Sequence, residues 1–415
     1  MTTLTLKSSS LLRDASTQKI LGVLNAQQAG CARLVGGCVR DAILGQQPGD
    51  VDIATQLTPE VVMAACKAAG IKTIPTGLAH GTITAIVDGR PFEITTLRKD
   101  IATDGRHAQV AFTDDWHGDA LRRDFTMNAL YCDANGVVFD PTGQGVVDAK
   151  TGDVVFVGDA DARILEDHLR ILRYFRFTAR FAKGPLLGEA LLACARHKDA
   201  IGALSVERVW SELKKILGAP DPRHAVVAMA SNGVLAVVLP EATGTLAFHN
   251  LVALECDAFL EPDPLQRLMA LLPREVGVAT QVTARLKLSK IEADRLMAWA
   301  SDQTALVSYM SAREVRAALY WMGNDLYLDR VRVAWASDPE PRRKTQWRTM
   351  IAFESGFVAP KFPVDGNMAM AAGARPGPNV GAVLSEVERW WVASDFIDDE
   401  LSVIERLKAV VQGLG

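Results

Sequence analysis

Residues 36–55 place a glycine pair, an arginine and two aspartates immediately before and within an apolar run. Val51 and Ile53 alternate with Asp50 and Asp52, which is typical of a strand with one buried face. Because residues two apart on a strand project from the same face, the two carboxylates are predicted to lie side by side. Adjacent carboxylates repel each other unless a cation lies between them, and Mg²⁺ completed by phosphate oxygens is the usual solution. The segment therefore indicates a sheet that carries a metal site.

The residues upstream suit a phosphate-binding turn. Gly36 and Gly37 allow the backbone to approach a triphosphate closely, and Arg40 can supply a counter-charge. A lone Asp-x-Asp is more often a solvated strand end. The glycine pair and the arginine are what favour a metal and nucleotide site here.

Two further β-rich runs are predicted at residues 83–87 and 92–97, on either side of an Asp-Gly dipeptide that is typical of hairpin turns. Glu93 stands between Phe92 and Ile94, so its side chain is expected on the polar face of its strand. By itself, this glutamate is more simply explained as a surface residue.

A charged cluster, Arg122-Arg123-Asp124, is followed at once by apolar residues and is therefore predicted at the edge of an element. Arginines in such a position can hold phosphate or ribose. A capped helix start with incidental charge fits the same residues equally well.

Together these motifs resemble the signature of the polymerase-β-like nucleotidyltransferases, and specifically of the class II tRNA nucleotidyltransferases, the CCA-adding enzymes and their bacterial poly(A) polymerase relatives. The residues that carry the resemblance are Gly36-Gly37, Arg40-Asp41, Leu44-Gly45, Asp50-x-Asp52, Phe-Glu-Ile-Thr-Thr-x-Arg from residue 92 and Arg-Arg-Asp-Phe-Thr from residue 122. The resemblance implies that Asp50 and Asp52 bind the metal, that Glu93 completes this catalytic site, and that Gly37, Arg40 and Arg123 contact the nucleotide.

Residues 98–115 are polar and are predicted to form a long loop. The stretch resembles the flexible loop of CCA-adding enzymes, with Ala108 where that family usually has proline. Arg106 in this loop is expected to matter more for the addition of A than for the addition of C.

An amphipathic helix is predicted over residues 160–182, with Asp167, Arg170, Arg173 and Arg176 every three residues along one face. Asp167 and Arg170 offer an acceptor and a donor, which match the amino group and ring nitrogen of cytosine and adenine and mismatch uracil and guanine. The pair resembles the family's Glu-Asp-x-x-Arg motif, and Arg173 and Arg176 are expected to face the triphosphate or the RNA end. A solvated helix face is the alternative.

Composition narrows the class of protein. The chain has 415 residues, 49% of them hydrophobic, which is enough for more than one domain. No window approaches a membrane span and the N-terminus lacks a signal peptide's apolar core, so a cytoplasmic protein is predicted. Six scattered cysteines indicate reduced thiols and no structural zinc. The net charge is −4, yet basic residues outnumber acidic ones between residues 163 and 183, so a positive strip adjoins the predicted site.

The predicted fold is α+β, with a polymerase-β-like nucleotidyltransferase domain followed by helices. β-rich runs alternate with short helical patterns as far as residue 150, and helical periodicity dominates afterwards. The resemblance implies four parts, which are a catalytic domain with a small mixed sheet at residues 1–150, a helical nucleotide-recognition neck at 151–225, a helical body at 226–340 and a helical tail at 341–415.

The resemblance implies template-independent addition of C, C and A to the 3′ end of tRNA from CTP and ATP, with release of pyrophosphate and with Mg²⁺ as cofactor. A poly(A) polymerase is one alternative, against which stand the CCA-like segment His80-Gly81-Thr82 and the lack of a long basic C-terminal tail. An A-only or CC-only tRNA nucleotidyltransferase is another. A non-catalytic RNA-binding scaffold would require vestigial carboxylates. No membrane partner is expected, and the oligomeric state is left open.

Overall fold

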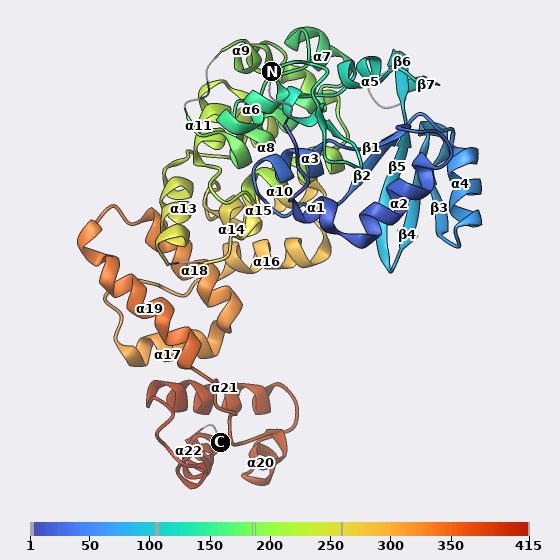
Figure 1. Cartoon of the computed structure of the whole chain (residues 1–415). Coiled ribbons are helices and arrows are strands. Elements are labelled where there is room, and N and C mark those ends of the chain that lie inside the picture. The colour runs from blue at the N-terminus through green and yellow to red at the C-terminus, as the bar shows by residue number, and fades with distance from the viewer. Residues whose placement is uncertain (1–3, 104–107, 185, 187, 259, 414–415) are drawn as a thin grey trace. The chain divides into compact units, whose positions relative to one another are not determined.

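The computed structural model describes residues 4–103, 108–184, 186, 188–258 and 260–413. The chain divides into two compact units, Met1–Pro240 and Glu241–Gly415 (Figure 1). The first unit combines a sheet with helices, and the second is built from helices. This is the α+β fold that the sequence predicts. The finer division at residues 150, 225 and 340 stays a prediction.

A seven-stranded mixed sheet in the order β3-β4-β5-β2-β1-β8-β9 lies in the first unit. Its strands are β1 (Ala32–Val35), β2 (Asp52–Thr55), β3 (Lys72–Gly77), β4 (Thr82–Val87), β5 (Arg90–Thr96), β8 (Tyr131–Cys132) and β9 (Val138–Phe139). β2 runs parallel to β5, and the other neighbouring strands are antiparallel. The strand predicted around Val51 and Ile53 coincides with β2, and the β-rich runs predicted at residues 83–87 and 92–97 coincide with β4 and β5.

The β4–β5 hairpin follows the alternation in its sequence. Phe92 and Ile94 are almost completely buried, whereas Glu93 between them is exposed. Asp88 (φ 49°) and Gly89 (φ 81°) make the turn, and two left-handed residues in succession match the twist of a two-residue hairpin. The predicted orientation of Glu93 is therefore confirmed.

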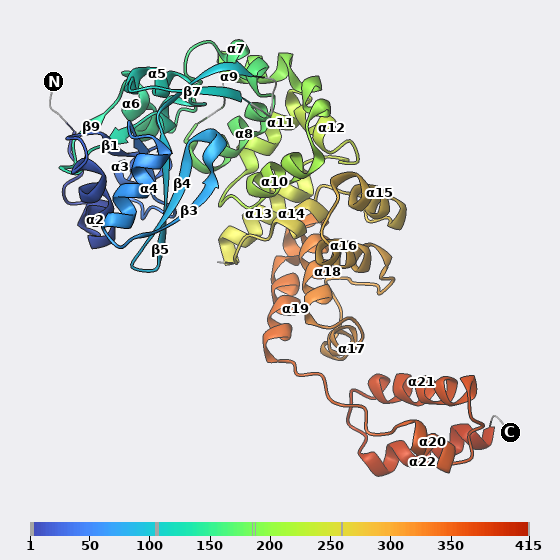
Figure 2. The ribbon, with the colours of Figure 1, turned by 90° about the vertical axis from the view of Figure 1, so that its right-hand side faces the viewer.

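Helices α2 (Ala15–Asn25) and α4 (Pro59–Ala68) pack against each other and against strands of the sheet, so they cover one of its faces (Figure 2). Ile20, Leu21 and Leu24 of α2 are fully buried there. α3 (Gly37–Ile43) follows β1 after a single residue, so the glycine pair stands where a strand turns into a helix.

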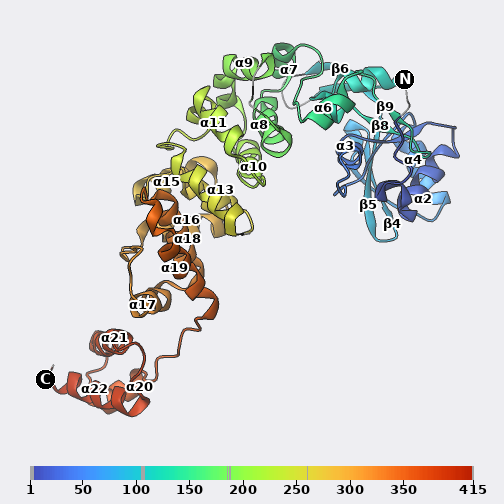
Figure 3. The ribbon, with the colours of Figure 1, turned by 60° about the vertical axis from the view of Figure 1, so that its left-hand side comes forward.

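Other helices complete the first unit. They are α1 (Ser10–Arg13), α5 (Trp116–Leu121), α6 (Gly145–Thr151), α7 (Ala160–Glu166), α8 (Leu169–Phe181), α9 (Glu189–Arg196), α10 (Val206–Leu217), α11 (Arg223–Ser231) and α12 (Val234–Val238). α10 and α11 both pack on α8 (Figure 3). Ile171, Leu172 and Phe175 of α8 are completely buried, which leaves the arginines of this helix on its other side.

The single helix predicted over residues 160–182 is in fact two helices. α7 ends at Glu166 and α8 begins at Leu169, because Asp167 has an extended backbone (φ −151°, ψ 105°). Its carboxylate accepts a hydrogen bond from the backbone N–H of Leu169 (3.1 Å), which satisfies one of the free amides at the start of α8. Asp167 thus lies outside the helix that carries the arginines.

The loop predicted over residues 98–115 contains two strands. β6 (Arg98–Thr103) and β7 (Ala108–Phe112) pair antiparallel. The composition did not reveal this hairpin, because strands pair through their backbones and need no apolar face to do so. The base of this hairpin rests on Gly81, where a Cβ would lie 2.7 Å from the Phe112 ring. Arg106 lies outside the described residues.

The second unit contains α13 (Leu246–Ala258), α14 (Pro264–Met269), α15 (Val276–Leu286), α16 (Lys290–Ser301), α17 (Ala312–Met322), α18 (Asn324–Ser337), α19 (Lys344–Gly356), α20 (Gly366–Ala371), α21 (Pro378–Ala393) and α22 (Glu400–Gly413). One apolar core joins α17, α18 and α19 around Tyr327 and Trp347, and another joins α20, α21 and α22 around Val387 and Trp391. Across the part of the chain that the structure describes, no helix is long and apolar enough to span a bilayer.

Candidate active site

Asp52 and Glu93 lie opposite each other on the parallel strands β2 and β5, where they are register partners. Asp50 lies in a bend just before β2. Asp52 is partly buried, whereas Asp50 and Glu93 are exposed. Burial and the negative charge of Glu93 raise the pKa of the Asp52 carboxyl to about 6, and Asp50 adds to this rise.

The charge and chemistry of these three carboxylates fit a divalent cation. Carboxylate oxygens are the ligands that hard cations prefer, and a bound cation would relieve the repulsion that raises the pKa of Asp52. As they stand, no three or more His, Cys, Asp or Glu side chains among the described residues are placed so that they could together hold a metal ion. The structure thus brings Asp52 and Glu93 into register, and Asp50 is near enough to act on Asp52 through its charge.

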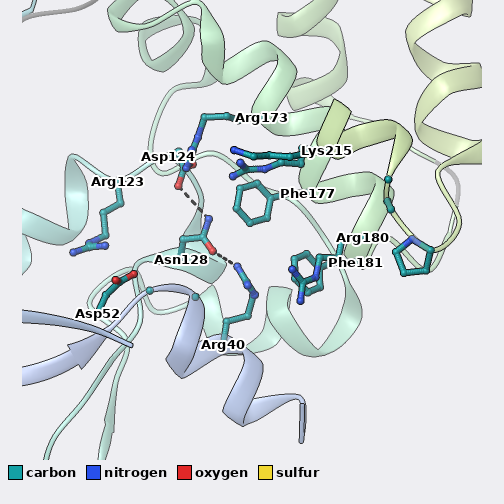
Figure 4. A pocket seen from close by; sticks show the side chains of 16 residues that line it. Arg40, Asp52, Arg123, Asp124, Asn128, Arg173, Phe177, Arg180, Phe181 and Lys215 are labelled. Carbon is teal, nitrogen blue, oxygen red and sulfur yellow. Dashed lines mark hydrogen bonds and ion pairs between the residues drawn. The ribbon is translucent and has the colours of Figure 1, made fainter. Parts of the chain in front are cut away.

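A cavity of about 700 Å³ lies beside Asp52 (Figure 4). Its acidic lining residues are Asp52 and Asp124, whereas its basic ones are Arg40, Arg123, Arg173, Arg176, Arg180 and Lys215. Figure 4 shows Asp52 and Arg123 at one side of the cavity and Arg180 with Phe181 at the other. An excess of positive side chains around a concave site favours an anionic ligand.

The glycine pair lies in the wall of this cavity. Gly36 has a φ of +74°, a region in which L side chains are strained. A Cβ at this position would lie 3.6 Å from the Arg123 guanidinium, and one at Gly37 would lie 3.5 Å from Arg40 Nη2. The glycines therefore keep the wall free of side chains next to two of the cations.

Arg40 is buried and held by two residues. Its Nε and Nη2 donate to Asp41 Oδ1 (3.0 and 2.7 Å), and its Nη1 donates to Asn128 Oδ1 (2.5 Å). The guanidinium also lies 4.2 Å from the centre of the Phe181 ring. Burial lowers the pKa of Arg40, and the Asp41 carboxylate opposes this shift.

Arg123 is held by Asp119, a residue for which the sequence suggested no role. Its Nε and Nη2 donate to Asp119 Oδ2 (3.3 and 3.1 Å), to which the Tyr131 hydroxyl also donates (2.7 Å), while Arg122 donates to Oδ1 (2.9 and 2.7 Å). Burial alone would raise the pKa of Asp119, but Arg123 and Arg122 outweigh it and hold that pKa below its usual value. The sequence signal that could have indicated this pairing is the spacing of Asp119, an acid four residues before Arg123.

Arg173 and Arg176 both line the cavity from α8. Arg173 Nε donates to Asp124 Oδ2 (2.8 Å), and Arg176 Nη1 donates to Glu212 Oε1 (3.0 Å) on α10. Lys215 shares the same Glu212 oxygen at 3.5 Å. Two cations thus share one carboxylate, which leaves part of their positive charge for a ligand.

Asp167 and Arg170 lie outside the lining that the described residues give this cavity. Arg170 Nη1 donates to Glu166 Oε2 and to the Arg163 carbonyl (both 2.6 Å), while Asp167 Oδ2 accepts from Arg208 Nη2 (2.9 Å). Each member of the predicted pair is therefore held by partners of its own. Their role in base selection stays a prediction.

Two family models match the chain. A poly(A) polymerase head domain matches residues 32–155, and a probable RNA and SrmB-binding site of polymerase A matches residues 188–245. Both matches lie within the first unit except for the last few residues of the second.

Curated relatives match nearly the whole chain. The mitochondrial CCA tRNA nucleotidyltransferase 1 of Mus musculus is 35% identical over 94% of this chain and 89% of the mouse protein. The CCA-adding enzyme of Levilactobacillus brevis is 31% identical over 87% of this chain and 90% of that protein. The crystal structure of the Bacillus stearothermophilus CCA-adding enzyme in complex with CTP has a TM-score of 0.76 at 26% identity, covering 97% of this chain and 99% of that one. With this identity along almost its full length, the chain belongs to the family of CCA tRNA nucleotidyltransferases, the CCA-adding enzymes.

Proposed function

We propose that this protein adds C, C and A in turn to the 3′ end of tRNA, from CTP and ATP and without a nucleic-acid template, and releases pyrophosphate. The observation that carries the proposal is the cavity beside Asp52, in which basic side chains outnumber acidic ones. Its volume of about 700 Å³ suits a nucleotide-sized ligand, and its charge suits a triphosphate. A relative of known structure binds CTP, which supports the choice of substrate.

Enzymes of this family generally depend on a metal ion, and we propose Mg²⁺, held by Asp50, Asp52 and Glu93. When bound, it would supply positive charge to the attacking 3′-hydroxyl oxygen and to the phosphates. The Asp52 carboxylate can bind a metal only when it has lost its proton, and burial together with the charges of Glu93 and Asp50 raises its pKa and so opposes that loss.

The arginines of the cavity take the role of phosphate and nucleotide contacts in this proposal. Arg40, Arg123, Arg173 and Arg176 are each tied to a carboxylate, so their guanidiniums are in place before a substrate arrives. Prepositioned charge stabilises a transition state without reorganisation of the site. Gly37 contributes to nucleotide binding through the open wall beside Arg40.

Base selection is proposed for Asp167 and Arg170. Glu166 holds Arg170 and Arg208 holds Asp167, so each side chain has a fixed position from which it can meet the edge of a base. An acceptor beside a donor accepts C and A and leaves polar groups unpaired with U or G. One pair of side chains could thus admit both substrates.

The alternatives use the same site. A poly(A) polymerase would extend many RNAs with A alone, and an A-only or CC-only enzyme would perform part of the reaction. The names of the relatives favour complete CCA addition. A cytoplasmic location stays a prediction, and the relatives from mouse and human carry "mitochondrial" in their names.

The reaction can be tested with tRNA transcripts that lack the CCA end. Each nucleotide is supplied alone and in pairs, and the 3′ ends are sequenced. We expect CC from CTP alone and CCA from CTP with ATP. Runs of A would indicate a poly(A) polymerase, A added only to transcripts that end in CC would indicate an A-only enzyme, and a stop at CC with both nucleotides present would indicate a CC-only enzyme.

The site can be tested with Asp52→Ala, which removes a carboxylate that the metal and phosphates require. We expect kcat for both C and A addition to fall by about 10³-fold or more, while tRNA affinity in a filter-binding assay stays close to wild type. Asp50→Ala should act similarly, and Glu93→Gln should be milder or equally severe. Chelation of the metal should stop addition, and added Mg²⁺ should restore it.

Asp88→Asn is the matched control for these variants. Asp88 is an exposed carboxylate in the β4–β5 turn of the same sheet, and asparagine tolerates its positive φ. Activity should stay at the wild-type level. Near-normal turnover of Asp52→Ala would remove the proposed site.

A further inference from the structure

A chain of four polar side chains crosses one wall of the cavity (Figure 4). Arg40 Nη1 donates to Asn128 Oδ1 (2.5 Å), and Asn128 Nδ2 donates to Asp124 Oδ1 (3.2 Å). Asp124 Oδ2 in turn accepts from Arg173 Nε (2.8 Å). This hydrogen-bonded chain of side chains joins α3 to α8 through the 3₁₀ turn η2 (Thr126–Asn128) and the residues just before it.

The chemistry of the chain prescribes an amide in its middle. A guanidinium can only donate hydrogen bonds and an ionised carboxylate can only accept them. Asn128 faces Arg40 on one side and Asp124 on the other, so it must offer an acceptor to the first and a donor to the second. Its amide can therefore take only one orientation, and neither aspartate nor alanine can replace both bonds.

The hydrogen-bonded chain also links two like charges that both lie near one aromatic ring. Arg40 and Arg173 lie 5.4 and 5.8 Å from the centre of the same ring, that of Phe177. Negative charge near each guanidinium lowers their mutual repulsion. Asp41 supplies that charge at Arg40 and Asp124 supplies it at Arg173, and Asn128 joins the two ion pairs.

Burial makes these bonds costly to lose. Arg40, Asp124 and Asn128 are all less than one-tenth exposed. A buried polar group that loses its partner bears the full penalty of desolvation. Arg173 is about one-third exposed and is the end of the chain that is open to solvent.

We propose that Asn128 is a positioning residue, which sets the separation of Arg40 and Arg173 so that both guanidiniums meet the phosphates of one incoming nucleotide. The inference rests on the proposed function and deepens it. It predicts that nucleotide affinity depends on the hydrogen bonds that connect the two arginines through positions 124 and 128. The affinity should therefore depend on the two residues as a pair.

An exchange of the two residues tests this directly. Asn128→Asp places a second carboxylate beside Asp124 and removes the donor between them. The double variant Asp124→Asn/Asn128→Asp restores one amide and one carboxylate, with the carboxylate now next to Arg40 and the amide carbonyl next to Arg173, but it loses the acceptor that Asp124 Oδ1 offers to the Phe125 N–H (2.9 Å). Because the exchange also restores the net charge of the wall, Asn128→Ala, which changes no charge, separates positioning from charge alone.

Two measurements separate positioning from folding. The dissociation constant for CTP is measured by equilibrium titration without tRNA, and KM and kcat are measured with tRNA. For Asn128→Asp we expect CTP affinity to fall about tenfold or more, and for the double variant we expect part of this loss to be recovered, since the Phe125 N–H still lacks its acceptor. Asn128→Ala, which adds no charge, should also weaken CTP binding and should change KM more than kcat.

Asn135→Asp is the control, because it adds the same charge at an exposed position of the same unit. It should bind CTP as the wild type does. Thermal unfolding of every variant is recorded, and Asn128→Ala carries the test should Asn128→Asp fail to fold. The proposal is overturned if Asn128→Ala binds CTP normally, or if the double variant binds it no better than a folded Asn128→Asp. A wild-type protein that adds no nucleotide to tRNA would instead overturn the proposed function.

Discussion

In the first unit, the basic side chains that line the cavity outnumber the acidic ones. In the second unit, Arg267 and Arg295 are instead ion-paired with neighbouring carboxylates. Arg267 and Glu255 form an ion pair at 2.7 Å with 0% and 2% of their side chains exposed. Arg295 donates to both Asp263 and Asp329 at 2.6 Å. The Arg267–Glu255 pair is closed to solvent and Arg295 is about one-third exposed, and both sets of ion pairs join helices of the second unit.

The difference shows how one residue type serves two ends. A cation that a carboxylate neutralises within a closed core has little left to offer a ligand. A cation that shares its carboxylate beside a cavity, as Arg176 and Lys215 share Glu212, keeps part of its field for a ligand. Removal of an arginine should therefore affect stability in the second unit and substrate binding in the first.

The largest expected effect is on stability in the second unit. Glu255→Ala removes the carboxylate that forms the buried ion pair with Arg267, and we expect a loss of about 3–5 kcal/mol in the free energy of unfolding. Urea unfolding followed by tryptophan fluorescence measures it. The double variant Glu255→Leu/Arg267→Met is the control and should be less destabilised, because no charge remains buried. A loss below about 1 kcal/mol for Glu255→Ala would break the comparison.

An intermediate effect, on nucleotide selectivity, is expected for ion pairs of the first unit that could serve either structure or substrate binding. Asp167 and Arg170 are ion-paired with Arg208 and Glu166, yet they are predicted to read the base. Asp167→Ala and Arg170→Ala should lower kcat/KM for CTP and ATP by a factor equivalent to about 1–3 kcal/mol. They should also reduce the ratio of kcat/KM for CTP and ATP to that for UTP and GTP. Sequencing of the 3′ ends measures misincorporation.

Asp161→Ala is the matched control for this selectivity test, because Asp161 lies on α7 and is ion-paired with Arg196. Its selectivity among the four nucleotides should be that of the wild type. If Asp167→Ala and Arg170→Ala also keep wild-type selectivity, their pairs are structural and resemble those of the second unit.

The smallest effect is expected for Arg180→Gln. Arg180 is more than half exposed at the cavity and lies 4.0 Å from its nearest carboxylate partner, Asp41. We expect KM for CTP to rise by about three- to tenfold with no change in the unfolding temperature, and the difference should shrink as salt increases. Arg13→Gln, an exposed arginine outside the cavity lining, is the control. A shift in unfolding temperature without a change in KM would place Arg180 with the structural arginines.

The sheet and most helices could be predicted because their information is local. Phe92, Glu93 and Ile94 alternate in the sequence as they do in burial. The break at Asp167 could not be predicted in the same way, since helical periodicity continues across it. The extended backbone of Asp167 ends α7, and its carboxylate accepts from the Leu169 N–H at the start of α8. In the β6–β7 hairpin, β6 was missed because Arg98–Thr103 is mostly polar, and β7 was missed because the short apolar stretch Ala108–Phe112 stands at the end of a polar segment.

The candidate site divides along the same line. Asp52, Glu93 and Arg123 each stand in a short motif that lies within a single segment of the sequence. Asn128 and Glu212 were missed because their significance lies in partners 88 and 36 residues away in the sequence. Spacing within a motif reveals residues that act on a ligand, and residues that hold other residues in place emerge only from the folded chain.

The surplus of basic side chains in the cavity also bears on how each round of addition ends. Pyrophosphate retains most of the negative charge of the triphosphate from which it is cleaved. A lining that holds a nucleotide through its phosphates therefore retains this product as well, and departure of one polyanion must precede arrival of the next. Turnover is expected to slow as pyrophosphate accumulates, and its removal by hydrolysis would keep the mature 3′ end from being taken apart again.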